Sequence, residues 1–236
     1  SAPRFAYTLG GNLTAQQPLN NIARVAIETL TAVLGGVQTI ATSSFDEAYC
    51  LPSREAVTVA LRTEQIIAHE IGVTNLVDAL GGSYALEHLT TRIEQEVGEI
   101  IEKVESMGGA VACIERGFFQ RELAEAAYRR QKAIDNGGKV LVGLNRYRDR
   151  DEKVSIPVFK VDPESERRQV QRLRELRMTR DTDAVARALA ALEDAARRGE
   201  NIIPTTIEAA KSYATLGEIC DTLRKEYGSY VPSTVI

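Results

Sequence analysis

The chain has 236 residues, 44% of them hydrophobic, so it can bury a sizeable core and form one or two domains. Its 29 basic and 33 acidic side chains give a net charge of -4, and no basic block or aromatic-rich basic face marks a surface for nucleic acid. No apolar run approaches the roughly 18 residues that a membrane helix needs, and the N-terminus lacks the pattern of a signal peptide. The sequence therefore predicts a cytoplasmic protein that binds neither nucleic acid nor a membrane.

The first part of the chain alternates between strand patterns and helix patterns. Apolar residues at helical spacing follow each short apolar run, and glycine marks the end of each helix. This alternation predicts βα units on a parallel sheet. The expected strands cover residues 4–8, 37–42 and, more weakly, 73–79, and the expected helices run from Pro18 to Gly35 and from Ser53 to Gly72.

Beyond residue 85 the pattern becomes helical. A long amphipathic stripe predicts a helix over 86–107, which the Gly108-Gly109 pair ends. The further elements expected are helices over 110–115 and 118–136, a strand over 139–145, and three or four helices between residues 163 and 227. The chain is therefore expected to divide into a βα part and a helical part near residues 85–95.

Two adjacent carboxylates, Asp46 and Glu47, lie in the loop 42–53 that follows the second predicted strand. In parallel α/β folds the carboxyl ends of the strands form the ligand face, so this position indicates a binding site. A structural alternative is an acidic pair near the start of the next helix, where the helix dipole favours negative charge. For Asp46 we expect a role within the loop, where it would cap the turn.

The glycine pair Gly10-Gly11 follows the first predicted strand. Such pairs mark tight connections, and at a strand exit they also let backbone approach a flat ligand. Neither a dinucleotide-binding fingerprint nor a P-loop is present, and His69 and His88 have no metal-ligand spacing, so no metal site is predicted. Pattern alone predicts part of a parallel α/β protein with a helical extension.

Several segments resemble one enzyme family in order and spacing. They are QQPLNNIARVAIETLTAVLGGVQTIATSSFDEAYCLP, LRTEQIIAHEIGV, DALGGSYALEHLT, KVESMGG and RRQKAIDNGGKVLVGLNRY. Together they resemble the large subunit of the coenzyme B12-dependent acyl-CoA mutases, the methylmalonyl-CoA and 2-hydroxyisobutyryl-CoA mutase family. The similarity covers nearly the whole chain.

The resemblance implies a fold and a set of partners. It implies the C-terminal portion of a TIM (β/α)8 barrel over residues 1–90 and a mainly helical extension over 91–236. In this family the acyl-CoA binds along the central axis of the barrel. The early barrel strands and the Asp-x-His-x-x-Gly signature of the cobalt ligand are absent. We therefore expect a C-terminal segment or split subunit of such a mutase, in a hetero-oligomer with an N-terminal barrel chain and a small cobalamin-binding subunit, and adenosylcobalamin shared between chains.

The resemblance also implies site residues, although no catalytic residue is expected on this chain. Glu47 aligns with a glutamate that accepts a hydrogen bond from the ribose of the adenosyl group, a role that suits a fixed carboxylate. The other cofactor-binding candidates are Ala48, Leu51, Ser43, Gly10 and Gly11, and the substrate-binding candidates are Arg4 and Gln38.

Departures from the family leave two functions open. The histidine and asparagine usual at the second strand are Ala41 and Ser43 here. Where the family's first strand has a histidine and a glutamine, this sequence has Phe5, Ala6, Tyr7 and Thr8. The leading hypothesis is a segment of an adenosylcobalamin-dependent acyl-CoA mutase that rearranges a carbon skeleton through radicals and is inactive alone. The alternative is a noncatalytic subunit that stabilises such a mutase.

Overall fold

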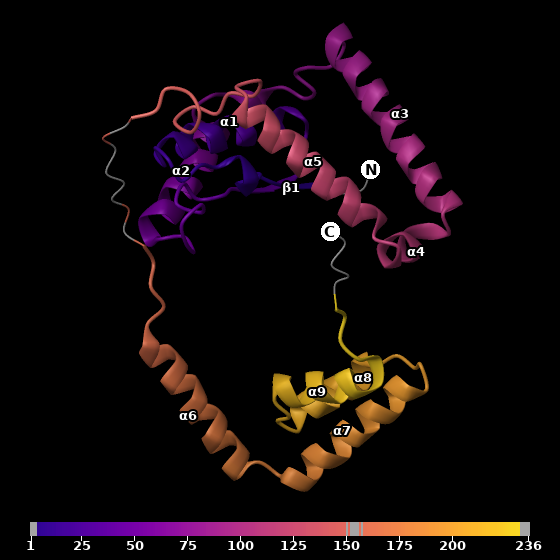
Figure 1. The fold of residues 1–236 in the computed structure, drawn as a ribbon. Coiled ribbons are helices and arrows are strands. Elements are labelled where there is room, and N and C mark those ends of the chain that lie inside the picture. The colour runs from indigo at the N-terminus through magenta and orange to yellow at the C-terminus, as the bar shows by residue number, and fades with distance from the viewer. Residues whose placement is uncertain (1–3, 150, 152–155, 157, 232–236) are drawn as a thin grey trace. The chain divides into compact units, whose positions relative to one another are not determined.

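The computed structural model describes residues 4–149, 151, 156 and 158–231. This part of the chain divides into two compact units, one ending at Phe159 and the other beginning at Lys160 (Figure 1). The architecture is a mostly helical α/β fold with one small parallel sheet. The barrel and the boundary predicted at residue 90 rest on the family resemblance, and both stay predictions.

The first unit begins with the predicted β–α–β–α order. Strands β1 (Phe5–Tyr7) and β2 (Thr39–Ala41) pair in parallel, with Ala6 opposite Ile40, and helices α1 (Asn20–Leu34) and α2 (Arg54–His69) follow them. The two helices pack on each other. The buried apolar residues of the two helices are Val25, Ala56, Ala60 and Ile67, and Phe45 of the loop between β2 and α2 is buried as well.

The ends of both helices follow from local chemistry. The hydroxyl of Ser53 accepts a hydrogen bond from the backbone N–H of Ala56 at 3.2 Å, so one of the free donors at the start of α2 is satisfied. Helix α1 ends at the Gly35-Gly36 pair, where Gly36 has a φ of 74°. A left-handed residue of this kind stops a helix, and glycine adopts it without steric cost.

Two predicted strands are wrong. Residues 73–79 form the 3-10 helix η2 (Val73–Asn75) and a turn in which Asp78 has a φ of 52°. Residues 139–145 form a turn, because the Asn145 amide donates to the carbonyls of Ile134 and Lys139 at 2.7 Å, while its oxygen accepts from the N–H of Leu141. The Asn145 side chain thus forms hydrogen bonds with backbone groups that, in a sheet, would pair with a neighbouring strand.

Three helices complete the first unit, and all three were predicted. They are α3 (Tyr84–Ser106), α4 (Gly109–Glu115) and α5 (Phe118–Asp135). Helix α4 packs on both α3 and α5, and Cys113 of α4 is fully buried. Helix α3 has no buried residue, so its long apolar stripe lies exposed.

The described part of the second unit, up to residue 231, contains four helices, which agrees with the prediction of three or four. They are α6 (Pro163–Thr179), α7 (Thr182–Arg197), α8 (Ile203–Lys211) and α9 (Leu216–Tyr227). Helices α7, α8 and α9 pack around Leu192, Ala209 and Ile219. At the edge of this core Arg180 donates two hydrogen bonds to Glu218 at 2.5 and 2.7 Å, and this contact lowers the pKa of Glu218 to about 2.

Candidate functional site

Two loops meet at the carboxyl end of the sheet. The first follows β1 and contains the 3-10 turn η1 (Gly10–Asn12), and the second, residues 42–53, follows β2. They are joined at Ser43, whose N–H donates to the Thr8 hydroxyl at 2.7 Å and whose own hydroxyl donates to the Thr8 carbonyl at 3.1 Å. Because β1 and β2 are parallel, both loops leave the sheet at the same end.

Asp46 stabilises the second loop from within. The side chain is fully buried, and its Oδ2 accepts a hydrogen bond from the Ser53 N–H at 2.8 Å. This bond closes the loop just before α2 begins, which confirms that Asp46 has a role within the loop. Oδ1 of Asp46 is buried and has no hydrogen-bond partner in the described part of the chain.

Asn21 fixes both loops to α1. It is fully buried, and its Nδ2 donates to the carbonyls of Thr14 and Phe45 at 2.9 Å, while Oδ1 accepts from the Thr14 N–H and from Arg24. Sequence reasoning missed this residue. A signal was available, since Asn21 is four residues before buried Val25 and shares its face of the helix. A polar residue on an apolar face indicates a buried hydrogen-bonding role.

The carboxylate of Glu47 lies against the first loop. Glu47 is exposed, and a Cβ placed on Gly10 would lie only 2.3 Å from its Oε1. Any side chain at position 10 would therefore displace this carboxylate. A Cβ on Gly11 would meet only the side chain of Leu9, at an ordinary 3.9 Å. Of the two predicted glycines, the structure brings Gly10 to Glu47.

The remaining cofactor-binding candidates differ in their exposure. Ala48 and Leu51 are exposed beside Glu47 in the chain, and Leu51 retains 65% of its accessible surface. Ser43 is 1% exposed, and its hydroxyl already serves the Thr8 carbonyl. A ligand at this carboxyl end of the sheet, the carboxyl rim, can therefore reach Glu47, Ala48 and Leu51 directly, whereas Ser43 is buried.

The substrate-binding candidates lie at the opposite end of the sheet. Arg4 precedes β1 and Gln38 precedes β2. The Arg4 N–H donates to Oε1 of Gln38 at 2.6 Å, and Nε2 of Gln38 donates to the Gly36 carbonyl at 2.9 Å. Both polar ends of the Gln38 side chain are thus engaged within the chain. The predicted site residues therefore form two groups, one at each end of the strands.

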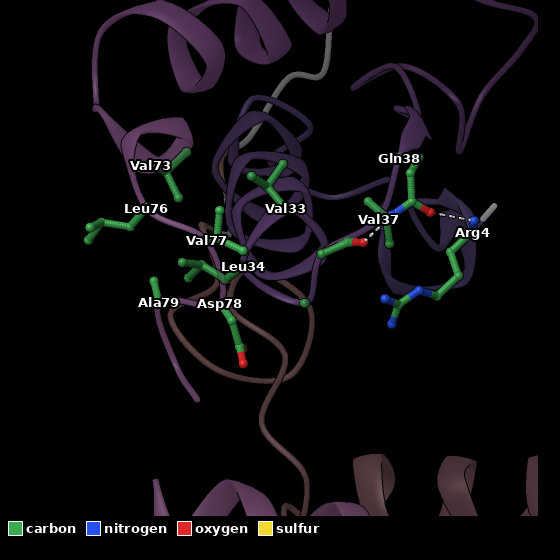
Figure 2. A pocket seen from close by; sticks show the side chains of 12 residues that line it. Arg4, Val33, Leu34, Val37, Gln38, Val73, Leu76, Val77, Asp78 and Ala79 are labelled. Carbon is green, nitrogen blue, oxygen red and sulfur yellow. Dashed lines mark hydrogen bonds between the residues drawn. The ribbon is translucent and has the colours of Figure 1, made fainter. Parts of the chain in front are cut away.

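A pocket of about 650 Å³ lies at this amino end of the sheet. Figure 2 shows Arg4 and Gln38 on one side of it and Val73, Leu76 and Ala79 on the other. Its lining combines aliphatic side chains with the charged side chains of Arg4 and Asp78. The Arg4 guanidinium can bind an anionic group of a ligand.

Comparison with known proteins identifies the family. The model of the methylmalonyl-CoA mutase family matches residues 4–229. The chain belongs to that family. The methylmalonyl-CoA mutase of Rhizobium meliloti (strain 1021) is 42% identical over 232 residues, which cover 97% of this chain and 32% of the relative.

Two further relatives of this mutase-family chain show the same pattern. The 2-hydroxyisobutanoyl-CoA mutase large subunit of Aquincola tertiaricarbonis is 40% identical over 94% of the chain and 40% of its own length. The mitochondrial methylmalonyl-CoA mutase of Homo sapiens is 39% identical over 94% of the chain and 30% of its own length. The chain thus spans about a third of the length of these relatives. None of the helices in the described ranges is long and apolar enough to cross a membrane.

Proposed function

We propose that this chain supplies the last βα units of a (β/α)8 barrel, over residues 1–90, and a helical extension, over residues 91–236, to an adenosylcobalamin-dependent acyl-CoA mutase. The mutase would catalyse a radical 1,2 rearrangement of the carbon skeleton of an acyl-CoA thioester. The single observation that carries the proposal is the exposed Glu47 carboxylate at the carboxyl end of the parallel sheet, in a chain whose relatives are mutases.

The sheet has the features expected of a barrel fragment. Each strand is followed by a helix, and a sheet of two parallel strands leaves an outer edge on each strand. Phe5 and Tyr7 lie on one face of β1, since side chains alternate along a strand, and they are 64% and 58% exposed. Further strands on either side would pair the edges, and closure of the sheet into a barrel would cover the side chains on its inner face.

The carboxyl rim fits the adenosyl group of the cofactor. Glu47 offers an exposed carboxylate that can accept hydrogen bonds from sugar hydroxyls. Ala48 and Leu51 add exposed apolar surface beside it, which suits a flat ring system, and Gly10, which has no side chain, leaves room for the Glu47 carboxylate. We assign these four residues to the cofactor, with Ser43 and Gly11 supporting the two loops.

The chemistry divides between cofactor and protein. When bound, adenosylcobalamin supplies the radical that starts the rearrangement. In our proposal the Glu47 carboxylate accepts hydrogen bonds from the ribose. The two loops after β1 and β2 exclude water from the radical intermediates. Arg4 and Gln38, at the other end of the strands, contact the CoA part of the substrate, and the pocket that they line binds a portion of the CoA chain.

The complete mutase needs further parts. We propose that an N-terminal barrel chain supplies the first strands and that a small cobalamin-binding subunit carries the corrin, in a hetero-oligomer. The name of one relative includes "large subunit", which supports such an assembly. The roles assigned to this chain are the same if those parts belong to its own polypeptide. Purification of the native protein with its partners, followed by intact-mass analysis, tests this composition directly.

The test of the site is cofactor affinity in the complete mutase. Glu47→Gln keeps the shape of the side chain but weakens it as an acceptor, so we expect adenosylcobalamin to bind about tenfold more weakly or worse. Glu70→Gln, an exposed glutamate at the end of α2, is the matched control and should change nothing. Equal affinities for the wild type and both variants would refute the assignment of Glu47.

The alternative is a noncatalytic subunit that stabilises a mutase, and the replacement of the family's residues at Ala6, Ala41 and Ser43 favours it. Titration of the purified complex separates the two functions. If the complex binds adenosylcobalamin and the Glu47→Gln variant binds it less well, the chain takes part in cofactor binding. If the complex assembles but its affinity for adenosylcobalamin is the same in the wild type and in Glu47→Gln, the chain has the structural role.

A further inference from the structure

The turn at Gly10–Asn12 is held by two helices that are far apart in the sequence. From α1, the Glu28 carboxylate accepts hydrogen bonds from the Leu9 N–H at 3.0 Å and from Nδ2 of Asn12 at 2.8 Å. From α5, Nη2 of Arg130 donates to the Gly11 carbonyl at 3.2 Å and to Oδ1 of Asn12 at 3.0 Å. The turn is thus bonded on both sides.

Asn12 joins the two charged side chains. Its amide donates to Glu28 with one end and accepts from Arg130 with the other, so an acid and a base are linked through a neutral group. Hydrogen bonds to charged partners are the stronger kind, and Asn12, Glu28 and Arg130 are all at least partly shielded from water. This arrangement fixes the turn more firmly than its own short 3-10 hydrogen bonds can.

The position of the turn determines where Glu47 can lie. The backbone of Gly10 is the surface on which the Glu47 carboxylate rests, as the 2.3 Å approach of a Cβ placed there shows. A shift of the turn would therefore open or close the space that this carboxylate occupies. The same turn carries the Gly11 carbonyl that Arg130 binds.

We propose that Arg130 is a positioning residue for the cofactor rim: from the helical extension it holds the Gly10–Asn12 turn, and through that turn it sets the position of the Glu47 carboxylate. The inference rests on the proposed function only in its last step, the effect on cofactor binding. It gives the helical extension a direct part in the site, although Arg130 itself touches neither Glu47 nor a reacting group.

Arginine suits this role because its planar guanidinium can serve two acceptors at once, whereas lysine is a single flexible point charge. Arg129 provides a matched control one position earlier on α5. Its guanidinium pairs with Glu125 on the same helix, and its side chain is 62% exposed. Substitution of Arg129 removes the same charge from the same helix without touching the turn.

The experiment compares Arg130→Gln, Arg130→Lys and Arg129→Gln in the complete mutase. The first measurement is hydrogen exchange of the backbone amides of residues 9–13 without cofactor. We expect about tenfold faster exchange or more in Arg130→Gln, an intermediate rate in Arg130→Lys, and the wild-type rate in Arg129→Gln. A rate in Arg130→Gln equal to that of Arg129→Gln would overturn the proposal.

The second measurement is adenosylcobalamin affinity in a double-mutant cycle with Glu47→Gln. Arg130→Gln should weaken binding when Glu47 is present and add little when Glu47 is already replaced, since it acts through that residue. An equal effect in both backgrounds would overturn the link to Glu47. If Glu47→Gln alone leaves affinity unchanged, the proposed function fails in its site, while the exchange data still decide whether Arg130 holds the turn.

Discussion

Two regions of the molecule, the α7–α9 bundle of the second unit and helix α3 of the first, differ in how completely they bury their apolar side chains. In the second unit, Leu192 and Ala209 are fully buried and α7, α8 and α9 enclose them. In the first unit, the 23 residues of α3 include no buried side chain, and the aromatic rings of β1 are more than half exposed. A small region that closes its own core stabilises itself, whereas long exposed apolar stripes indicate a surface that is covered in a larger assembly.

The largest effect is expected in the closed core of the second unit. Leu192→Ala removes a fully buried side chain from the contact of α7 with α8 and α9, and should lower the free energy of unfolding by about 2–5 kcal/mol. Urea unfolding of the 236-residue chain, followed by circular dichroism, measures the change. A loss below about 1 kcal/mol would show that this core is loosely packed and would remove the contrast between the units.

The next effect is the pH dependence of the second unit. The hydrogen bonds from Arg180 lower the pKa of Glu218 from 4.5 to about 2, so the folded state favours the ionised form. This stabilisation is present above the pKa of the unfolded chain and is lost as the pH falls from about 4.5 to about 2. Because the Glu218 side chain is 24% exposed and solvent screens its charge, we expect it to contribute about 2 kcal/mol to the free energy of unfolding, less than the pKa shift alone would imply.

Glu218→Gln isolates this contribution. The variant should be less stable than the wild type at pH 7, and the difference should shrink as the pH is lowered toward 2, because protonation of Glu218 progressively removes the charge that glutamine lacks. Unfolding experiments at several pH values provide the measurement. A difference that stays constant over this range would mean that Glu218 acts through its shape and not through its charge.

The sequence was sufficient to predict those helices and strands that depend on local periodicity. The alternation of β1, α1, β2 and α2 was predicted because apolar spacing and glycine stops lie within short windows. The strand predicted over 139–145 failed, since a short apolar run does not reveal that the Asn145 side chain will take its backbone groups. No short-range pattern could have joined Arg130 to Gly11, which lie 119 residues apart.

For the site itself, the sequence and the resemblance selected residues but could not arrange them. They did not show that Gly10, and not Gly11, lies against Glu47, nor that the Ser43 hydroxyl is engaged by Thr8. The predicted parallel sheet already implied that Arg4 and Gln38 lie at the amino ends of their strands, away from Glu47, but it did not show that the Gln38 side chain is hydrogen-bonded to Arg4 and Gly36. Such facts depend on three-dimensional packing.

Alanine substitutions at Gly10 and Gly11 in the first unit should differ in their effect on cofactor binding and not in their effect on stability. Gly10→Ala should displace the Glu47 carboxylate and weaken adenosylcobalamin binding by the complete mutase several-fold, while stability changes little, because the end of a flexible side chain can move aside. Gly11→Ala meets only an ordinary contact and should leave binding unchanged. Equal affinities of the two variants would contradict the contact between Gly10 and Glu47.

The smallest effect is expected on the exposed stripe of α3. Ile93 is 58% exposed, so Ile93→Ala removes few contacts in the 236-residue chain, and alanine is the better helix former. These two contributions oppose each other, and we expect the free energy of unfolding to change by less than about 0.5 kcal/mol. The same urea experiment that measures Leu192→Ala makes this comparison direct. A cost near that of the buried leucine would mean that α3 packs its stripe within this chain, and the difference between the two units would then disappear.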